Sequence, residues 1–175
     1  MRSLYASMLA LAMTVLLCAC VSNAPVWETV DDELPLLVSG RGPSSIVFAA
    51  PDGAVRQTFA DTGTPQVYAA PDGSYEITAC VLAETDADAV IEQLTGFDAE
   101  RVDKVATTRF SLPAYDFAWS AAGDEGDRVY RAEVLFDEDY CYALCFSVPA
   151  GSGTSYDSIQ ESVFASFGLY YDEML

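Results

Sequence analysis

Apolar and polar residues alternate along three segments in the first half of the chain, a pattern typical of strands with one buried face. These segments span residues 45–50, 66–70 and Tyr75–Ala83. The pentapeptide AAPDG occurs twice, at residues 49–53 and 69–73. Because proline, aspartate and glycine in this order favour a tight turn, we expect each copy to end one strand and lead into another.

Two other segments carry apolar residues at a helical period. Thr85 or Asp86 can cap the first helix, and Gly96 is expected to end it in the left-handed conformation. The second helix is expected near Ser155–Phe167, with Gly168 as its left-handed C-terminal residue. The apolar stripe of the first helix consists of Ala87, Val90, Ile91 and Leu94.

Between the two helices, the pattern indicates an antiparallel meander of four strands. They are expected at residues 104–112, 114–121, 128–136 and 140–148, where tyrosine, phenylalanine, tryptophan and valine are abundant. The last segment, YCYALCFSV, is apolar on both faces, which favours a central strand in a covered sheet. We therefore predict an α+β fold in which helices cover an antiparallel β-sheet.

The N-terminal residues have the pattern of an export signal. Arg2 precedes the apolar run Met8–Leu17, which is shorter than the ~20 residues of a membrane-spanning helix. The motif Leu17-Cys18-Ala19-Cys20 resembles the lipobox of bacterial lipoproteins. Because that motif requires a small residue before the cut, the resemblance implies that Cys20 rather than Cys18 receives the lipid. The alternatives are an ordinary secretory leader and an uncleaved anchor.

The lipobox divides the chain into three expected parts. Residues 1–19 would be a lipoprotein signal peptide, residues 20–35 a lipidated N-terminus and tether, and residues 36–175 a single globular domain. Within the tether, Trp27 and Val30 are the apolar residues that can dock on the domain. Two or three acyl chains on Cys20 would hold the protein on the extracytoplasmic face of a bacterial membrane.

The net charge limits the partners of the domain. The chain has 8 Lys+Arg and 27 Asp+Glu, a net charge of −19; without residues 1–19, which include Arg2, it becomes 7 − 27 = −20. Such a surface repels nucleic acid and anionic lipid headgroups. We therefore expect no nucleic-acid partner, and we expect the lipid anchor to hold the domain at the membrane.

The residue types also restrict the chemistry. The chain has no histidine, which excludes histidine-based nucleophilic and acid–base catalysis, and no nucleotide-binding glycine motif is present. We expect no catalytic residue and no cofactor. The candidates for calcium binding lie at two expected acidic turns, where carboxylates could act as ligands. They are Asp124, Asp127, Asp137 and Asp139.

Three cysteines remain in the expected domain: Cys80, Cys141 and Cys145. Four residues along a strand span about 13 Å, so Cys141 and Cys145 are too far apart for a disulfide with each other. Cys80 can pair with either of them if its strand is adjacent. Buried thiols are the other interpretation, and the pairing stays open.

The C-terminal third also resembles a known fold. Residues 128–150 and 155–169 are similar to the last strands and terminal helix of the PsbP-like α/β/α fold. The chain also resembles small uncharacterised bacterial lipoproteins. This resemblance implies a non-catalytic protein-interaction or assembly module on a membrane. The alternatives are a calcium- or small-ligand-binding module and a carboxylate-dependent hydrolase. An exposed aromatic patch near Tyr170–Tyr171 or Trp119 would favour partner binding.

Overall fold

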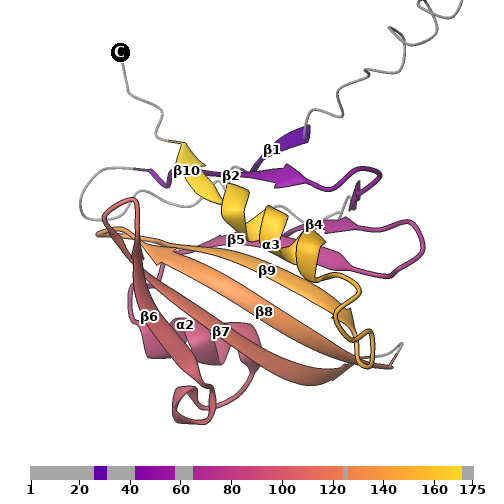
Figure 1. Cartoon of the computed structure of the whole chain (residues 1–175). Helices are drawn as coiled ribbons and strands as arrows, with labels where there is room; N and C mark the ends of the chain where they lie inside the picture. The colour runs from indigo at the N-terminus through magenta and orange to yellow at the C-terminus, as the bar shows by residue number, and fades with distance from the viewer. Residues whose placement is uncertain (1–25, 31–41, 58–64, 124–125, 171–175) are drawn as a thin grey trace, which may run out of the picture.

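The computed structural model describes residues 26–30, 42–57, 65–123 and 126–170. This part of the chain forms two antiparallel sheets, two α-helices and one short 3₁₀ helix, as Figure 1 shows. In chain order, the elements are β1 (Val26–Val30), β2 (Ser45–Ala50), β3 (Val55–Gln57), β4 (Gln66–Ala69), β5 (Glu76–Leu82), α2 (Ala87–Thr95), η1 (Ala99–Arg101), β6 (Lys104–Arg109), β7 (Leu112–Gly123), β8 (Gly126–Phe136), β9 (Cys141–Pro149), α3 (Asp157–Ser166) and β10 (Gly168–Tyr170).

The large sheet has the strand order β3-β4-β5-β9-β8-β7-β6, and all its neighbouring strands are antiparallel. Strands β6 to β9 form the predicted meander. β9 lies at the centre of the order, and its residues from Cys141 to Ser147 are all buried. This confirms the central strand predicted from its two apolar faces, and it confirms the predicted α+β class.

The large sheet lies between two covering layers (Figure 1). Helices α2 and η1 cover one face. The other face packs against α3 and a second sheet of order β1-β2-β10. The pattern of the sequence did not predict this second sheet, because its three strands come from residues 26–30, 45–50 and 168–170, which are far apart in the chain.

Helix α2 begins and ends as its sequence predicts. The carboxylate of Asp86 accepts hydrogen bonds from two backbone N–H groups of the first turn, at 3.0 and 2.9 Å. Gly96 ends the helix with a φ of 72°, a backbone conformation that residues other than glycine rarely adopt. Val90 and Ile91 are fully buried against the large sheet. The helix is therefore held by both its caps and its apolar stripe.

The C-terminal end of α3 differs from the prediction. Gly168 was expected to be a left-handed helix terminator, and this is wrong, because it pairs with Val47 and begins β10. Phe167 leaves the helix in an extended conformation, with φ −62° and ψ 130°. A Cβ atom on Gly168 would lie 3.6 Å from the ring of Phe110. The ring of Phe110, at the β6–β7 turn, therefore packs over Gly168 at a distance that a Cβ atom would also allow.

Strand β1 lies within residues 20–35, the stretch expected to be the tether. Val30 is 1% exposed and belongs to the core, whereas Trp27 is 60% exposed. Because β1 pairs with β2, the folded part of the chain that the structure describes starts at Val26. In the described ranges, no helix is long and apolar enough to cross a membrane.

Candidate functional site

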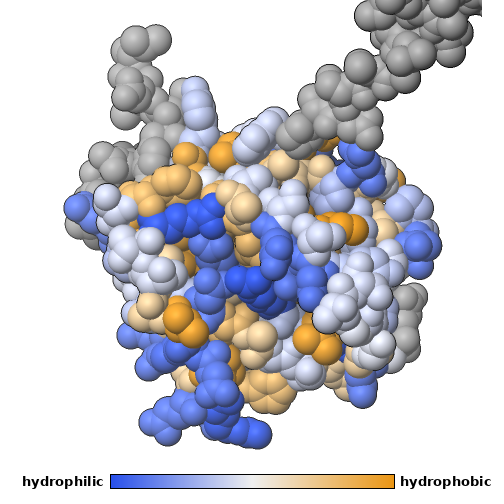
Figure 2. Space-filling model, viewed as in Figure 1, coloured by the Kyte–Doolittle hydropathy of each residue, from blue (hydrophilic) through white to orange (hydrophobic). Residues whose placement is uncertain are grey.

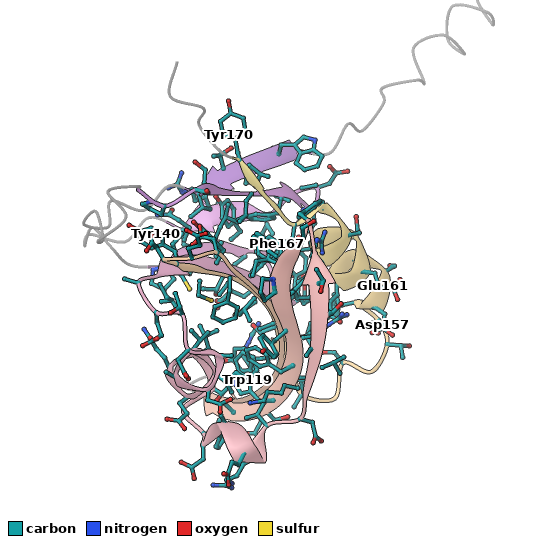
Figure 3. All side chains as sticks on the ribbon, turned by 90° about the vertical axis from the view of Figure 1, so that its left-hand side faces the viewer. Trp119, Tyr140, Asp157, Glu161, Phe167 and Tyr170 are labelled. Atoms are coloured by element: carbon teal, nitrogen blue, oxygen red, sulfur yellow. The ribbon has the colours of Figure 1, made fainter. Side chains whose placement is uncertain are left out.

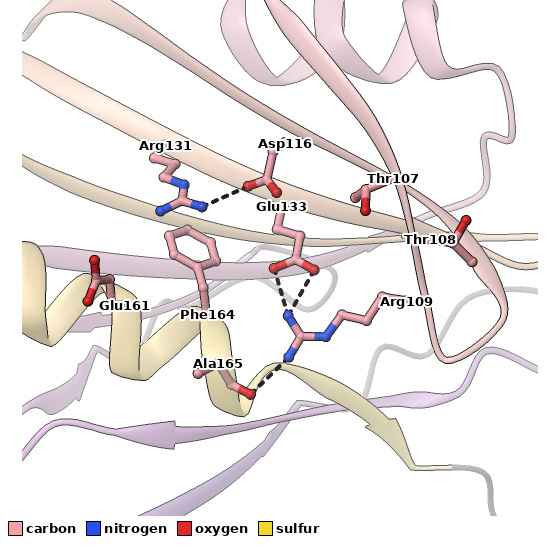
Figure 4. A pocket seen from close by; sticks show the side chains of 9 residues that line it. All are labelled: Thr107, Thr108, Arg109, Asp116, Arg131, Glu133, Glu161, Phe164 and Ala165. Carbon is pink, nitrogen blue, oxygen red and sulfur yellow. Dashed lines mark hydrogen bonds and ion pairs between the residues drawn. The ribbon is translucent and has the colours of Figure 1, made fainter.

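An open groove of about 470 Å³ lies on the α3 side of the large sheet. Its floor comes from β6, β7 and β8, and its wall comes from α3, which covers only part of this face (Figure 4). Figure 2 shows strongly hydrophilic side chains across the middle of the same face. The groove is lined by Thr107, Thr108, Arg109, Asp116, Arg131, Glu133, Glu161, Phe164 and Ala165.

Strand register brings two carboxylates together on the floor of the groove. Asp116 of β7 pairs directly with Glu133 of β8, so both side chains point to the same face. Like charges in this position repel each other, and each carboxylate is bound by an arginine. Arg109 Nη1 donates to both carboxylate oxygens of Glu133, at 2.9 and 2.8 Å. Arg131 Nη2 donates to Asp116 Oδ1 at 3.1 Å.

Arg109 also connects the sheet to α3. Its Nη2 donates to the carbonyl oxygen of Ala165 at 2.9 Å, in the last turn of the helix. This turn contains no basic residue of its own, so Arg109 supplies the cation that a helix C-terminus favours. The guanidinium carbon lies 5.8 Å from the ring centroid of Phe167. One side chain therefore links β6 to β8 and to the end of α3.

The second arginine has a more exposed position. The guanidinium carbon of Arg131 lies 4.8 Å from the ring centroid of Phe164, which is within the range of a cation–π contact. The side chains of Arg131 and Asp116 are 38% and 31% exposed, whereas those of Arg109 and Glu133 are 21% and 7% exposed. Loss of the Arg109–Glu133 pair should therefore cost more stability.

Burial raises the pKa of the Glu133 carboxyl group, and its hydrogen bonds from Arg109 and the positive charge of that residue act in the opposite direction. A raised pKa in the folded state means that protonation of Glu133 favours folding. This contribution is present at a pH below the pKa of the unfolded chain and is lost as the pH rises through the folded pKa. At neutral pH, Arg109 is the group that offsets the cost of the buried charge.

Strand β6 lies at the edge of the large sheet, beside this groove. Its residues Lys104 to Thr108 are all exposed, and Val105 is 66% exposed. Among the described residues, no strand pairs with its outer side. Lys104 forms an ion pair with Asp88 of α2 at one end of the strand, and Arg109 is bound at the other. The edge is therefore held at both ends and open between them.

The hairpin of β6 with β7 determines which backbone groups face this open edge. Arg109 pairs with Leu112 across a two-residue turn, and residues that close such a turn exchange backbone hydrogen bonds. The next pair, Thr108 and Pro113, is then non-bonded. Proline has no N–H group, which agrees with this assignment. The N–H and C=O groups of Thr108 therefore point away from β7.

The same alternation continues along β6. The backbone groups of Val105 and Thr107 bond to β7. Those of Ala106, like those of Thr108, point outward, away from β7. Ala106 and Thr108 are two residues apart, which is the repeat at which an added antiparallel strand forms its hydrogen bonds. The edge thus offers a short row of backbone donors and acceptors.

The described candidate calcium ligands lie at the two ends of β8, with Asp137 and Asp139 in one turn and Asp127 at the other end. Asp137 Oδ1 accepts from the backbone N–H groups of Asp139 and Tyr140, and Asp137 Oδ2 accepts from the hydroxyl of Tyr142 at 2.6 Å. Within the described ranges, no group of three or more Cys, Asp or Glu residues could hold a metal ion. Asp124 and Cys20 lie outside the described residues.

The three domain cysteines lie on one face of adjacent strands, beneath α2. Cys80 pairs with Ala143, so it is diagonal to both Cys141 and Cys145. In the structure, all three cysteines are buried and none forms a disulfide with another. Burial raises the pKa of Cys141 and of Cys145 well above the ordinary value, which keeps these groups protonated and unreactive.

Of the aromatic residues expected to form a patch, Trp119 is stacked on Tyr130 at 4.9 Å between ring centroids and on Phe117 at 5.7 Å. Tyr170 is 58% exposed, and Tyr171 lies outside the described residues.

The charged groove was not predicted from the sequence. The available signal was Arg131 and Glu133, two charges at alternate positions of a strand that is otherwise mainly apolar.

We expect the Arg109→Ala substitution to lower the free energy of unfolding by about 2–4 kcal/mol at pH 8, because it leaves the Glu133 carboxylate buried without its partner. The loss should be smaller at pH 4.5, because protonation of Glu133, whose pKa is raised by burial, removes the charge that Arg109 compensates. Urea denaturation of the full chain at both pH values measures this. Arg131→Ala is the matched control and should cost below about 1 kcal/mol. Equal costs for Arg109→Ala at the two pH values would contradict the assigned role of Arg109.

No family model matches the sequence, and no curated protein matches it. Solved structures resemble the fold at low sequence identity. A protein of Bacteroides thetaiotaomicron VPI-5482 matches with a TM-score of 0.50 and 11% identity; the match covers 73% of this chain and 46% of that one. The chain thus spans less than half the length of that protein.

Two further structures match along nearly their whole length. Cyanobacterial PsbP (CyanoP) from Synechocystis sp. PCC 6803 has a TM-score of 0.55 and 14% identity, and the match covers 86% of this chain and 96% of that one. LpqN of Mycobacterium tuberculosis, described as involved in cell envelope biogenesis, has a TM-score of 0.53 and 13% identity, with 85% and 93% covered. At these identities the likeness concerns the fold alone. The described domain therefore has a PsbP-like α+β fold.

Proposed function

We propose that the protein is a lipoprotein anchored through Cys20 to the extracytoplasmic face of a bacterial membrane, and that its domain binds an extended segment of a partner protein without catalysing a reaction. The lipobox at Leu17–Cys20 supports the anchor. A role at the cell envelope also agrees with the description of LpqN, which has a similar fold.

The observation that carries the binding function is the open edge of β6 beside the groove. An extended peptide can add to such an edge through main-chain hydrogen bonds to Ala106 and Thr108. Its side chains on one face would then enter the groove next to Thr107 and Asp116. Edge strands with regular pairing and no bulge tend to associate with other strands. Lysine side chains on an edge strand discourage such association, and β6 has one lysine, Lys104.

The charged groups of the groove support binding rather than proton transfer. A hydrolase of the two-carboxylate type needs one carboxyl group as an acid and the other as a base or nucleophile facing the substrate. Here, Glu133 accepts both its hydrogen bonds from Arg109, and Asp116 accepts from Arg131. These contacts organise the floor of the groove: both oxygens of Glu133 and one oxygen of Asp116 are bound by arginine.

The charge of the domain indicates the chemistry of the partner. The whole chain has 27 acidic and 8 basic residues, and such a negative charge attracts positively charged segments and repels acidic ones. The partner segment should therefore be extended and rich in Lys or Arg. Its association rate should fall as the salt concentration rises, because screening weakens electrostatic attraction at a distance.

The anchor can be tested by metabolic labelling with an alkyne fatty acid in a bacterial host. Label should be incorporated into the wild-type protein and into Cys18→Ala, and it should be absent from Cys20→Ala. The reason is that only the residue following the cut carries the lipid. If Cys18→Ala lost the label while Cys20→Ala kept it, the acceptor would be misassigned.

The edge can be tested by placing a photo-crosslinking amino acid at Val105, which is 66% exposed, in the anchored protein. The Ala106→Pro substitution removes an outward N–H group and no bond to β7, so folding should persist while the crosslinked product falls by about fivefold or more. Ala106→Ser is the matched control because it keeps the N–H group. Equal yields from the two variants, both folded by circular dichroism, would contradict binding at this edge.

A further inference from the structure

The small sheet has an outer face on which aromatic side chains remain exposed. Trp27 is 60% exposed, Phe110 66% and Tyr170 58%. Together with Val47 and Gly168, which lie between them, these residues are called the outer aromatic face below. A monomeric domain seldom leaves three large aromatic residues exposed on one small surface without a binding role.

Strand register places these residues on one side of the sheet. Trp27 pairs with Ala49, and Tyr170 pairs with Ser45, which are alternate residues of β2 on either side of Val47. Residues at this spacing point to the same side of a strand. The intervening residues of β2, Ile46 and Phe48, are fully buried in the core on the opposite side.

Phe110 reaches this face from the large sheet. It occupies the tip of the β6–β7 hairpin, and its ring packs over Gly168, 3.6 Å from the position that a Cβ atom would take there. Phe110 has a φ of 51° and Ser111 a φ of 66°. Glycine or asparagine is preferred in such a turn, so phenylalanine there carries a conformational cost. Its ring lies 5.3 Å from the guanidinium carbon of Arg109 and still remains 66% exposed.

We propose that the outer aromatic face lies in the interfacial region of the lipid bilayer that carries the anchor. This inference rests on the proposed attachment at Cys20. Val26 is six residues after Cys20, so the covalent chain allows at most about 20 Å between the lipidated residue and the start of β1. Trp27, beside that start, therefore lies close to the membrane surface.

The chemistry of the face fits the bilayer interface. Tryptophan and tyrosine are enriched at the level of the lipid headgroups, where their rings contact acyl chains and their polar atoms contact water. None of the five residues of the face carries a charge, although the chain as a whole has a net charge of −19. This face can thus approach the headgroups at a lower electrostatic cost than a face rich in carboxylates.

The orientation follows from the position of the face. Figure 3 places Tyr170 at the end of the molecule that carries the small sheet, and Trp119 in the half of the molecule away from that end. With the outer aromatic face on the membrane, β1 and β10 lie nearest the lipid. Trp119 and the β7–β8 end of the large sheet then point away from it.

The two tryptophans of the chain, Trp27 and Trp119, provide a direct test. The lipidated protein is reconstituted into phosphatidylcholine vesicles whose acyl chains carry bromine, a contact quencher of tryptophan fluorescence. In Trp119→Phe, where Trp27 is the remaining tryptophan, we expect the emission to fall about twofold relative to unbrominated vesicles. In the matched variant Trp27→Phe, the emission of Trp119 should stay unchanged.

A third variant tests the face itself. Phe110→Ser in the Trp119→Phe background should reduce the quenching of Trp27, because it removes one of the three aromatic contacts with the bilayer. Unchanged quenching in this variant would overturn the inclusion of Phe110 in the face. Circular dichroism of each variant establishes that the domain is folded before the comparison is made.

The outcomes separate this inference from the proposed anchor. Wild-type protein that floats with the vesicles, while Cys20→Ala does not, supports the anchor independently of orientation. If the anchored protein floats and Trp27 is not quenched by bromolipid, the membrane contact is overturned and the anchor stands. The membrane contact would also be overturned if Trp27 were shielded from aqueous iodide but not quenched by bromolipid. That result would indicate that Trp27 contacts protein instead. A protein that does not float overturns both.

Discussion

The ion pair between Arg109 and Glu133 determines how the outer strands of the large sheet are held to the rest of the domain. The side chain of Glu133 is 7% exposed, so its charge needs a partner that remains in place. Arg109 provides this contact and also binds the carbonyl of Ala165 at the end of α3. Because Arg109 is the last residue of β6, this one side chain fixes the strand edge, the groove and the β6–β7 turn together.

Both proposed binding surfaces meet at this arginine. On one side of Arg109, strand β6 presents the backbone groups of Ala106 and Thr108 next to the groove. On the other side, the β6–β7 turn carries Phe110 over Gly168 to the outer aromatic face. A protein anchored close to a membrane through this face would direct the edge of β6 sideways. A partner segment could then reach it without passing between the domain and the lipid.

The sequence predicted the elements whose signals are local. The caps and apolar stripe of α2 are consecutive in the chain, and so are the two apolar faces of β9 and the strands of the meander. Features that depend on distant segments could not be found in this way. Strand β10 was mistaken for a helix end because Gly168 suits both roles, and its partner Val47 is more than 100 residues away. The groove charges were missed for a similar reason, since Asp116 and Glu133 become neighbours only when β7 pairs with β8.

The central claim is that Arg109 holds β6 in place, and amide hydrogen exchange of the full chain measures this most directly. In Arg109→Ala, the amides of Val105 and Thr107, which bond to β7, should exchange at least about tenfold faster than in the wild type, because the end of the strand opens locally. The amide of Leu144 in the central strand should change far less. Equal acceleration at all three amides, or none at any of them, would contradict the claim.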